Sequence, residues 1–419
     1  MLRFVAEVEP GLAVDQSAVG TNPWRGGFAE VKSMDAVAVS TAEADSASAG
    51  RALGEQIKSG LGKTAHAVIV FAAPNYDHPV LLQALHDACS PELIVGASSA
   101  GEFTNDTLGV GLVSALAIND PETCFSLCVG RDLKADPAAA ARNIVAGFKG
   151  EANHSFPHRS ALVLTDALAG YADVLADELT VATAGEYQFF GGGAGDNASF
   201  ERTTVFSNTE VLSDAAVALE ILSHKPLGIG VSHGWEPASE PLRVTEAQGL
   251  TLVSLNGLPT VEAFEEHAAA KGEKLDRASP IPFFLQNILG IDTGSGFRLR
   301  VPLAVNPDGS VHCAAEIPAG SVVRIMKSSH QSAAEAAERA TDAAVAGIAG
   351  RDPKAALFFD CVATRLRCGD HFATEVASVT KKIGDAALVG CNTHGQIARA
   401  EGQFEGFHNC TAVVCVFPG

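Results

Sequence analysis

Apolar runs alternate with helix-like segments in the first part of the chain. A run at 67–71 is followed by a helical pattern over 79–89 and by a second apolar run at 93–95. A glycine-bearing loop at 96–103, GASSAGEF, precedes another apolar run at 111–118. Short apolar runs bounded by turn residues indicate buried strands, and longer periodic segments indicate helices. The predicted order is therefore strand, helix, strand, glycine loop, strand.

The same order of elements occurs twice more. The second copy carries the loop GGGAGDN at 191–197, and the third carries GCNTHGQI at 390–397. Three occurrences in matching context indicate an internal repeat, although glycine turns after strands are common in α/β proteins generally. The other predicted elements are 161–164, 172–182, 189–190, 203–206 and 215–221 in the second copy, and 355–359, 371–383, 386–389 and 411–417 in the third.

This pattern predicts the α/β class, with mixed sheets, helices packed on them and three related strand-helix-strand-loop-strand units. Strand patterns at 241–255 and 280–325, with a helical pattern at 259–271, predict a β-rich insertion before the third copy. An Ala-rich helical stretch at 328–350 leads into that copy. We place an N-terminal extension at 1–34, a first domain at 35–250 and a second at 251–419.

Composition and charge narrow the classes of partner. The 419 residues include 29 Lys and Arg against 49 Asp and Glu, which gives a formal net charge of −20. Such a surface repels phosphate backbones, so nucleic acids and anionic membranes are excluded as expected partners. Residues 1–12 lack the apolar core of a secretory signal, and no apolar stretch is long enough for a membrane span. With nine cysteines, an odd number, reduced thiols and a cytoplasmic location are expected.

The three glycine loops are the first candidates for a binding site. Glycines at strand ends let a backbone approach a ligand, and open α/β sheets usually bind small molecules beyond those ends. Turn chemistry alone is the alternative explanation for the polar residues of these loops. The segment Gly193-Ala-Gly195-Asp-Asn-Ala198 matches GxGxxA, but an extended pattern follows it instead of a helix, and no Walker sequence occurs. Nucleotide binding through these motifs is therefore not expected.

A thiol enzyme is the rival class. Cys391 beside His394, or Cys361 beside Arg365, could supply a thiol of lowered pKa for a hydrolase or transferase. No GxSxG elbow occurs, and neighbours three apart in a loop need not face each other. His408 precedes a buried strand, where a structural role is favoured.

Several motifs, in order, resemble those of the FIST sensory domain in its N-terminal and C-terminal parts. They are VGASSAGEF, FGGGAGDN, Gly234-Trp235, SLNGLPTVEAF, ALFFDC with Arg365, and VGCNTHGQI followed by FHNCT. The resemblance implies a sensor that binds a small ligand such as an amino acid and signals to a partner without catalytic activity. One branch of the family is described as haem-binding nitric-oxide sensors that regulate histidine kinases or cyclic-di-GMP enzymes.

The sequence departs from the family pattern in ways that bear on the ligand. Gln396 replaces a carboxylate, Cys410 replaces a glutamine, and His394 is an addition to the third loop. These changes weaken the expectation of an amino-acid ligand. A haem iron could take an imidazole such as His394, His371, His330 or His312 as its ligand. We predict a ligand site formed by loops from both domains, with these residues: Ser98, Ser99, Glu102, Asp196, Arg365, Asn392, His394, Gln396 and Asn409.

Overall fold

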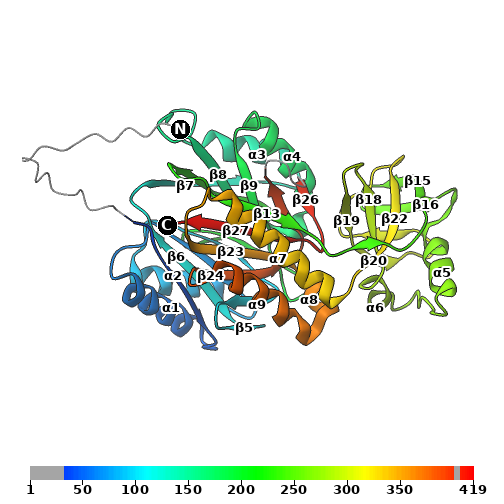
Figure 1. Cartoon of the computed structure of the whole chain (residues 1–419), viewed down its shortest axis with the longest axis horizontal. Coiled ribbons are helices and arrows are strands. Elements are labelled where there is room, and N and C mark those ends of the chain that lie inside the picture. Colours follow the sequence, from blue (N-terminus) through cyan, green and yellow to red (C-terminus); the bar gives the residue numbers. More distant parts are fainter. Residues whose placement is uncertain (1–32, 401–405) are drawn as a thin grey trace, which may run out of the picture. The chain divides into compact units, whose positions relative to one another are not determined.

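The computed structural model describes residues 33–400 and 406–419 (Figure 1). The predicted N-terminal extension, apart from its last two positions, lies outside the described residues, and so does the segment 1–12. Within the described residues, none of the helices combines the length and the apolar character that crossing a membrane requires.

Three units with the same order of elements confirm the predicted repeat and the α/β class. Each unit runs strand, helix, strand, helix, strand, hairpin, strand, with the second helix of the third unit divided in two. The first unit contains β1 (Asp35–Thr41), α1 (Ser46–Leu61), β2 (Ala67–Ala72), α2 (His78–Cys89), β3 (Ile94–Ser98), β4 (Glu102–Thr104), β5 (Leu108–Gly109) and β6 (Val113–Asn119). The second contains β7 (Thr123–Arg131), α3 (Pro137–Ala146), β8 (His158–Thr165), α4 (Ala172–Ala182), β9 (Gln188–Gly193), β10 (Val205–Ser207), β11 (Glu210–Leu212) and β12 (Ala215–Ser223). The third contains β13 (Gly228–Ser232), α7 (His330–Gly347), β23 (Pro353–Cys361), α8 (Val362–Cys368), α9 (Phe372–Ile383), β24 (Ala387–Thr393), β25 (Gln396–Arg399), β26 (Gly406–His408) and β27 (Ala412–Pro418).

The four long strands of each unit form one sheet, in the orders β1-β6-β2-β3, β7-β12-β8-β9 and β13-β27-β23-β24. The last strand of each unit lies between the first and second strands of that unit and is antiparallel to both. The last two strands of each order are parallel, and Ala72 is paired with Ser98, Thr165 with Gly193, and Cys361 with Thr393. The three glycine loops therefore begin at equivalent positions.

Each unit lends its hairpin to the sheet of another unit. The β10-β11 hairpin of the second unit pairs with β3 of the first, and β25-β26 of the third pairs with β9 of the second. The β4-β5 hairpin of the first unit pairs with β24 of the third, which completes the cycle. Because every sheet contains strands from two units, no unit can complete its sheet alone.

Alternate residues of the continuous apolar strands serve two cores. Ile69 and Phe71 face a core that all three sheets share, while Val68 and Val70 face the core beneath α1 and α2. In the third unit the outer core lies under α7 and α9, which lie side by side in Figure 1. A strand buried on both faces has no polar side to alternate with, so the sequence shows an unbroken apolar run.

The predicted β-rich insertion separates β13 from α7. Its sheet has the order β19-β18-β22-β15-β16-β21-β20, with β14 and β17 paired to its members. Residue 250, at our predicted domain boundary, lies in the turn between the paired strands β15 and β16. The elements are β14 (Glu236–Pro237), β15 (Leu242–Gln248), β16 (Thr251–Leu255), β17 (Leu258–Pro259), α5 (Thr260–Ala270), α6 (Ile281–Phe284), β18 (Ile288–Asp292), β19 (Phe297–Arg300), β20 (Pro302–Val305), β21 (Val311–Cys313) and β22 (Val322–Lys327).

Candidate functional site

The three glycine loops converge, and a closed ring of backbone hydrogen bonds joins them. The Gly195 N–H donates to the Ser98 carbonyl at 2.8 Å, and the His394 N–H donates to the Gly193 carbonyl at 3.0 Å. The Ala100 N–H donates to the Asn392 carbonyl at 2.9 Å, which closes the ring. A Cβ atom on Gly195 would lie 2.8 Å from the Ala100 nitrogen, so the loops touch backbone to backbone. Because glycine has no side chain, the backbone of a neighbouring loop can pack directly against it here.

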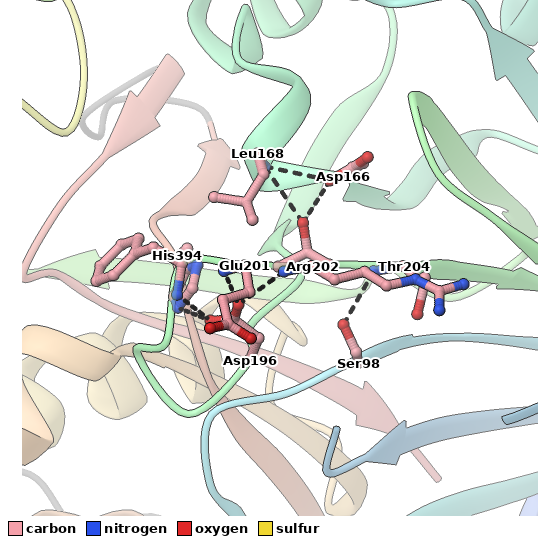
Figure 2. Close-up of polar contacts among 10 residues, drawn as sticks. Ser98, Asp166, Leu168, Asp196, Glu201, Arg202, Thr204 and His394 are labelled. Carbon is pink, nitrogen blue, oxygen red and sulfur yellow. Dashed lines mark hydrogen bonds and ion pairs between the residues drawn. The ribbon is translucent and has the colours of Figure 1, made fainter. Parts of the chain in front are cut away.

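The residues predicted in the first two loops hold the loops in place. The Thr204 N–H donates to the Ser98 hydroxyl at 3.0 Å (Figure 2). The Asp196 carboxylate accepts hydrogen bonds from three successive backbone N–H groups, those of residues 200–202, at 2.7 to 3.1 Å. Its Oδ1 atom also lies 3.4 Å from Nε2 of His394, across the boundary between the second and third units (Figure 2).

The surroundings of His394 do not fit a haem ligand. Its Nε2 atom faces Asp196, and Phe200 stacks on its ring with the centroids 4.8 Å apart. Burial lowers the pKa of His394, despite the opposing effect of Asp196. An axial ligand needs a nitrogen that faces an apolar pocket as wide as the macrocycle. Here a carboxylate lies against the Nε2 atom and an aromatic ring covers one face of the imidazole.

A second group of polar residues lies at the carboxyl ends of β23 and β24. Five buried side-chain nitrogen and oxygen atoms of this group have no hydrogen-bond partner within the described part of the chain. They are Arg365 Nε, Arg367 Nε and Nη2, and Asn392 Oδ1 and Nδ2, and beside them the Asp360 carboxyl group forms side-chain hydrogen bonds with Thr364 and Glu375. The group comprises Arg365, Arg367, Asn392, Asp360 and Thr364. We call these five residues the strand-end cluster. Buried polar groups in proteins are nearly always paired, so such a concentration marks a place built for something other than packing.

Local structure brings the cluster together. Asp360 and Asn392 are directly paired across the parallel strands β23 and β24. The short helix α8 begins immediately after Cys361, so Thr364, Arg365 and Arg367 follow within two turns. A cavity of about 10 Å³, the space of about one water molecule, lies beside the cluster, with Asp360, Thr364, Arg367, Glu375, Trp235 and Cys410 among its lining residues. The crevice beyond parallel strand ends is the usual ligand position in α/β sheets.

Burial controls the electrostatics of this cavity. It raises the pKa of Asp360 and of Glu375, and the charge of Asp360 raises that of Glu375 further. A proton held by Glu375 can therefore give Asp360 one partner. Arg367 is 7% exposed and lies over the Trp235 ring, 5.1 Å from its centroid, which leaves its in-plane Nε and Nη2 donors available. The cavity therefore presents the Arg367 guanidinium beside the acids Asp360 and Glu375, while Arg365 and Asn392 lie outside its lining.

Two residues of the first loop meet the cluster across the boundary between the first and third units. The Ser99 hydroxyl donates to Glu102 Oε1 at 2.6 Å, and the Leu112 N–H donates to Oε2 at 3.0 Å. Burial raises the pKa of Glu102 to about 7, against the opposing effects of these bonds and of Arg365. A Cβ atom on Gly101 would lie 2.6 Å from Asn392 Oδ1 and 3.2 Å from Arg365 Nε. Ser99, Glu102, Arg365 and Asn392, all predicted from sequence, thus come together.

Comparison with known proteins identifies the family. The FIST N domain matches residues 66–258, and the FIST C domain matches residues 262–399. The chain belongs to the FIST family. Its domains are sensory rather than catalytic. Two uncharacterized proteins from two strains of Mycobacterium tuberculosis are each 23% identical over 368 residues, covering 85% of this chain and 92% of theirs.

The solved structures that align with this chain do so only weakly. The structure of PurLQS from Thermotoga maritima aligns with 91% of this chain and 72% of its own, at 11% identity and a TM-score of 0.23. PurL of T. maritima complexed with AMPPCP aligns with the same shares at 12% identity and again a TM-score of 0.23. Such scores are too low to support a shared fold.

The other two predicted residues of this FIST protein bond to the backbone. With its amide turned to satisfy both ends, Gln396 accepts from the Cys361 N–H at 3.0 Å and donates to the Thr411 carbonyl at 3.2 Å. Asn409 accepts from the Val301 N–H at 3.4 Å and donates to the His408 carbonyl at 3.3 Å. His408 is buried, and burial lowers its pKa to about 3.

The two proposed thiol nucleophiles differ in the FIST protein. Cys391 is buried, and burial raises its pKa well above the usual value, which is opposite to the lowered pKa that the rival thiol-enzyme class would need. Cys361 does have a lowered pKa, of about 7, but the main cause is a hydrogen bond from the Cys410 thiol and not Arg365.

Sequence reasoning missed Asp360, Thr364, Arg367 and Glu375. One signal was present, since Asp360 ends the otherwise apolar run at 355–359 and a charge there is costly unless it is used. The other three lie on helices, where their polarity resembles that of an ordinary exposed face.

Proposed function

We propose that this FIST protein is a cytoplasmic small-ligand-binding sensor whose ligand occupies the strand-end cluster. The observation that carries the proposal is the group of unpartnered buried donors and acceptors on Arg365, Arg367 and Asn392. Each such group costs about 1–3 kcal/mol when it is left unpaired. A polar ligand that pairs with them recovers this free energy, which gives the site affinity and a preference for ligands of matching shape.

The ligand is a small molecule with acceptors for the two guanidinium groups and at least one donor for Asn392 or Asp360. The neutral form of Glu102, with a pKa of about 7, leaves Arg365 less strongly engaged and more available to the ligand.

Signalling follows if ligand binding favours one position of α8. This seven-residue helix carries Arg365 and Arg367, and it lies where the first and third units meet. A ligand that binds one arrangement more tightly by a few kcal/mol shifts the population toward it. By the family resemblance, the receiver is a histidine kinase or a cyclic-di-GMP enzyme.

Thermal-shift screening with amino acids, short organic acids and small amines tests the ligand site. Compounds that raise the melting temperature are then titrated by calorimetry against Asn392→Ala and Arg367→Met variants. Loss of a hydrogen bond to a charged group is worth about 1.5–3 kcal/mol, so we expect affinity to fall at least tenfold in the arginine variant. Arg142→Met is the matched control, because Arg142 is an exposed arginine on α3.

The proposal is refuted if no compound binds, or if a bound compound loses no more affinity in the two site variants than in the control. Signalling is tested separately, by adding the protein with and without the ligand to a histidine kinase and measuring autophosphorylation. Equal rates in both cases would remove the kinase from the proposal and leave the binding site standing.

A further inference from the structure

We infer that a second small-molecule site lies between the first and second units and takes a small zwitterion, which carries an ammonium and a carboxylate group. A cleft of about 450 Å³ lies there, within the size range of small-molecule sites. One wall comes from residues between positions 74 and 79, which follow β2 and begin α2, and the other from residues between positions 196 and 204 with Val211. None of these lining residues belongs to the strand-end cluster, so the inference stands apart from the proposed function.

The cleft occupies the same place in the first unit as the strand-end cluster does in the third. The parallel strands β2 and β3 end together, with Ala72 paired to Ser98, and the cleft lies just beyond these ends. Cys361 and Thr393 are the equivalent pair of the third unit. The crevice beyond the carboxyl ends of parallel strands is the usual ligand position in open α/β sheets. The repeat therefore provides this position in the first unit as well.

Contacts within the protein hold the floor of the cleft. His78 is only 9% exposed, its Nε2 atom lies 3.1 Å from the Ala73 carbonyl oxygen, and its Nδ1 atom lies 3.2 Å from the Thr204 hydroxyl. Burial lowers the pKa of His78, so the ring is neutral near pH 7. Because a carbonyl only accepts, Nε2 carries the proton and the Thr204 hydroxyl donates to Nδ1. This chain of bonds joins the two units, so a ligand binds a preformed floor.

The charged groups around the cleft are free to bind a ligand. Asp196 accepts hydrogen bonds from the backbone N–H groups of Glu201 and Arg202, which fixes where these two side chains begin (Figure 2). In the part of the chain that the structure describes, neither the Glu201 carboxylate nor the Arg202 guanidinium has a hydrogen bond or an ion pair. On the opposite wall, Asp77 Oδ1 accepts from the Val80 N–H at 3.3 Å, which leaves Oδ2 for another donor.

These charges select the class of ligand. The Arg202 guanidinium suits a carboxylate, which it can bind through two parallel hydrogen bonds, while Asp77 and Glu201 suit an ammonium group. A ligand with only a negative charge would meet two carboxylates, and one with only a positive charge would meet Arg202, so like charges disfavour both. A zwitterion satisfies both kinds of group. Pro74, Pro79 and Val211 add apolar surface for its carbon skeleton.

Binding in this cleft would also act on the third unit. Asp196, which lines the cleft, has its Oδ1 atom 3.4 Å from His394 Nε2. A ligand that holds the segment after Asp196 in place stabilises the arrangement in which the glycine loops meet, because it binds that arrangement more tightly than any other. The cleft thus gives the sensor a second input.

Calorimetric titration of the full chain with matched compounds tests the inference. The compounds α-, β- and γ-aminobutyrate carry both charges at three spacings, whereas butyrate lacks the ammonium group and propylamine lacks the carboxylate. We expect the best of the three aminobutyrates to bind about tenfold more tightly than butyrate and propylamine. No binding by any aminobutyrate, or equal affinity for a singly charged compound, overturns the inference.

Variants show whether the bound compound contacts the cleft. Arg202→Met should reduce the affinity for the best aminobutyrate about tenfold, and should leave propylamine binding unchanged or stronger because a like charge is gone. Arg142→Met is the matched control, since Arg142 is an exposed arginine on α3, and it should leave every affinity unchanged. Equal losses in the two variants contradict the inference.

Hydrogen exchange on the unmodified chain locates the compound without any substitution. Binding of the best aminobutyrate should slow exchange in the segments 74–80 and 199–204, which form the two walls. Slowed exchange at 360–368 alone, or a loss of affinity in Arg367→Met but not in Arg202→Met, would place the compound in the strand-end cluster. That outcome overturns this inference and supports the proposed function, so the two can be told apart.

Discussion

Replacing Glu102 by glutamine should change the stability of the protein in opposite directions at low and at high pH. In the folded protein burial raises the pKa of Glu102 from its usual value of 4.5 to about 7. The folded state therefore holds a proton that the unfolded state releases, and stability falls as the pH rises from about 4.5 through 7. At about 1.36 kcal/mol per pH unit, raising the pKa from 4.5 to about 7 corresponds to about 3 kcal/mol of stability.

Glu102→Gln removes this titration and keeps the shape of the protonated acid. Its amide oxygen can accept from the Leu112 N–H, and its NH₂ group can donate to the Ser99 hydroxyl. Near pH 5 the variant should match the unmodified protein or be slightly less stable. Near pH 8 it should be the more stable of the two, because the unmodified protein then buries a carboxylate.

Urea denaturation at pH 5, 6, 7 and 8 measures the effect as the difference in unfolding free energy between the two proteins. We expect that difference to change by about 3 kcal/mol across the series, in favour of the variant at high pH. Glu220→Gln is the control. Glu220 is just as buried, but its carboxylate accepts from two backbone N–H groups and from the Tyr187 hydroxyl, so its variant should be less stable at every pH. A difference for Glu102→Gln that stays constant from pH 5 to pH 8 would refute the reasoning.

Two further substitutions test the packing of the loops. Gly101→Ala should lower stability by about 3 kcal/mol in thermal or urea unfolding, because its Cβ would lie 2.6 Å from Asn392 Oδ1 at a φ of 140°. Gly62→Ala, at a φ of 64° with nothing within 4 Å of its Cβ, should cost only about 1 kcal/mol, and equal losses would contradict the steric argument. Asp196→Ala should leave three backbone N–H groups without their acceptor and make the segment 197–202 the first site of limited proteolysis, and an unchanged cleavage pattern would show that the carboxylate does not hold that segment.

The candidate site was partly predictable from the sequence. Asn392 was predicted from its place in a glycine loop after a buried strand, and Arg365 was predicted from the family resemblance and as a partner for a carboxylate. Arg367 and Glu375 could not be separated from exposed helix residues by pattern alone. Their burial depends on α9 packing over β23 and β24, which is a contact between distant parts of the chain.

The amino-acid sequence by itself determined the α/β class, the three copies and the places where strands end, because periodicity and glycine position are local signals. The exchange of hairpins among the three sheets was decided only in the tertiary structure, since the edge of one sheet must find a strand from another unit. That exchange brings the glycine loops into direct contact, so neighbouring backbone fills the space beside the glycines that suggested room for a ligand. The unpaired polar atoms lie at the carboxyl ends of β23 and β24. Packing between distant parts of the chain buried these groups, and no local pattern of the sequence could reveal their partners.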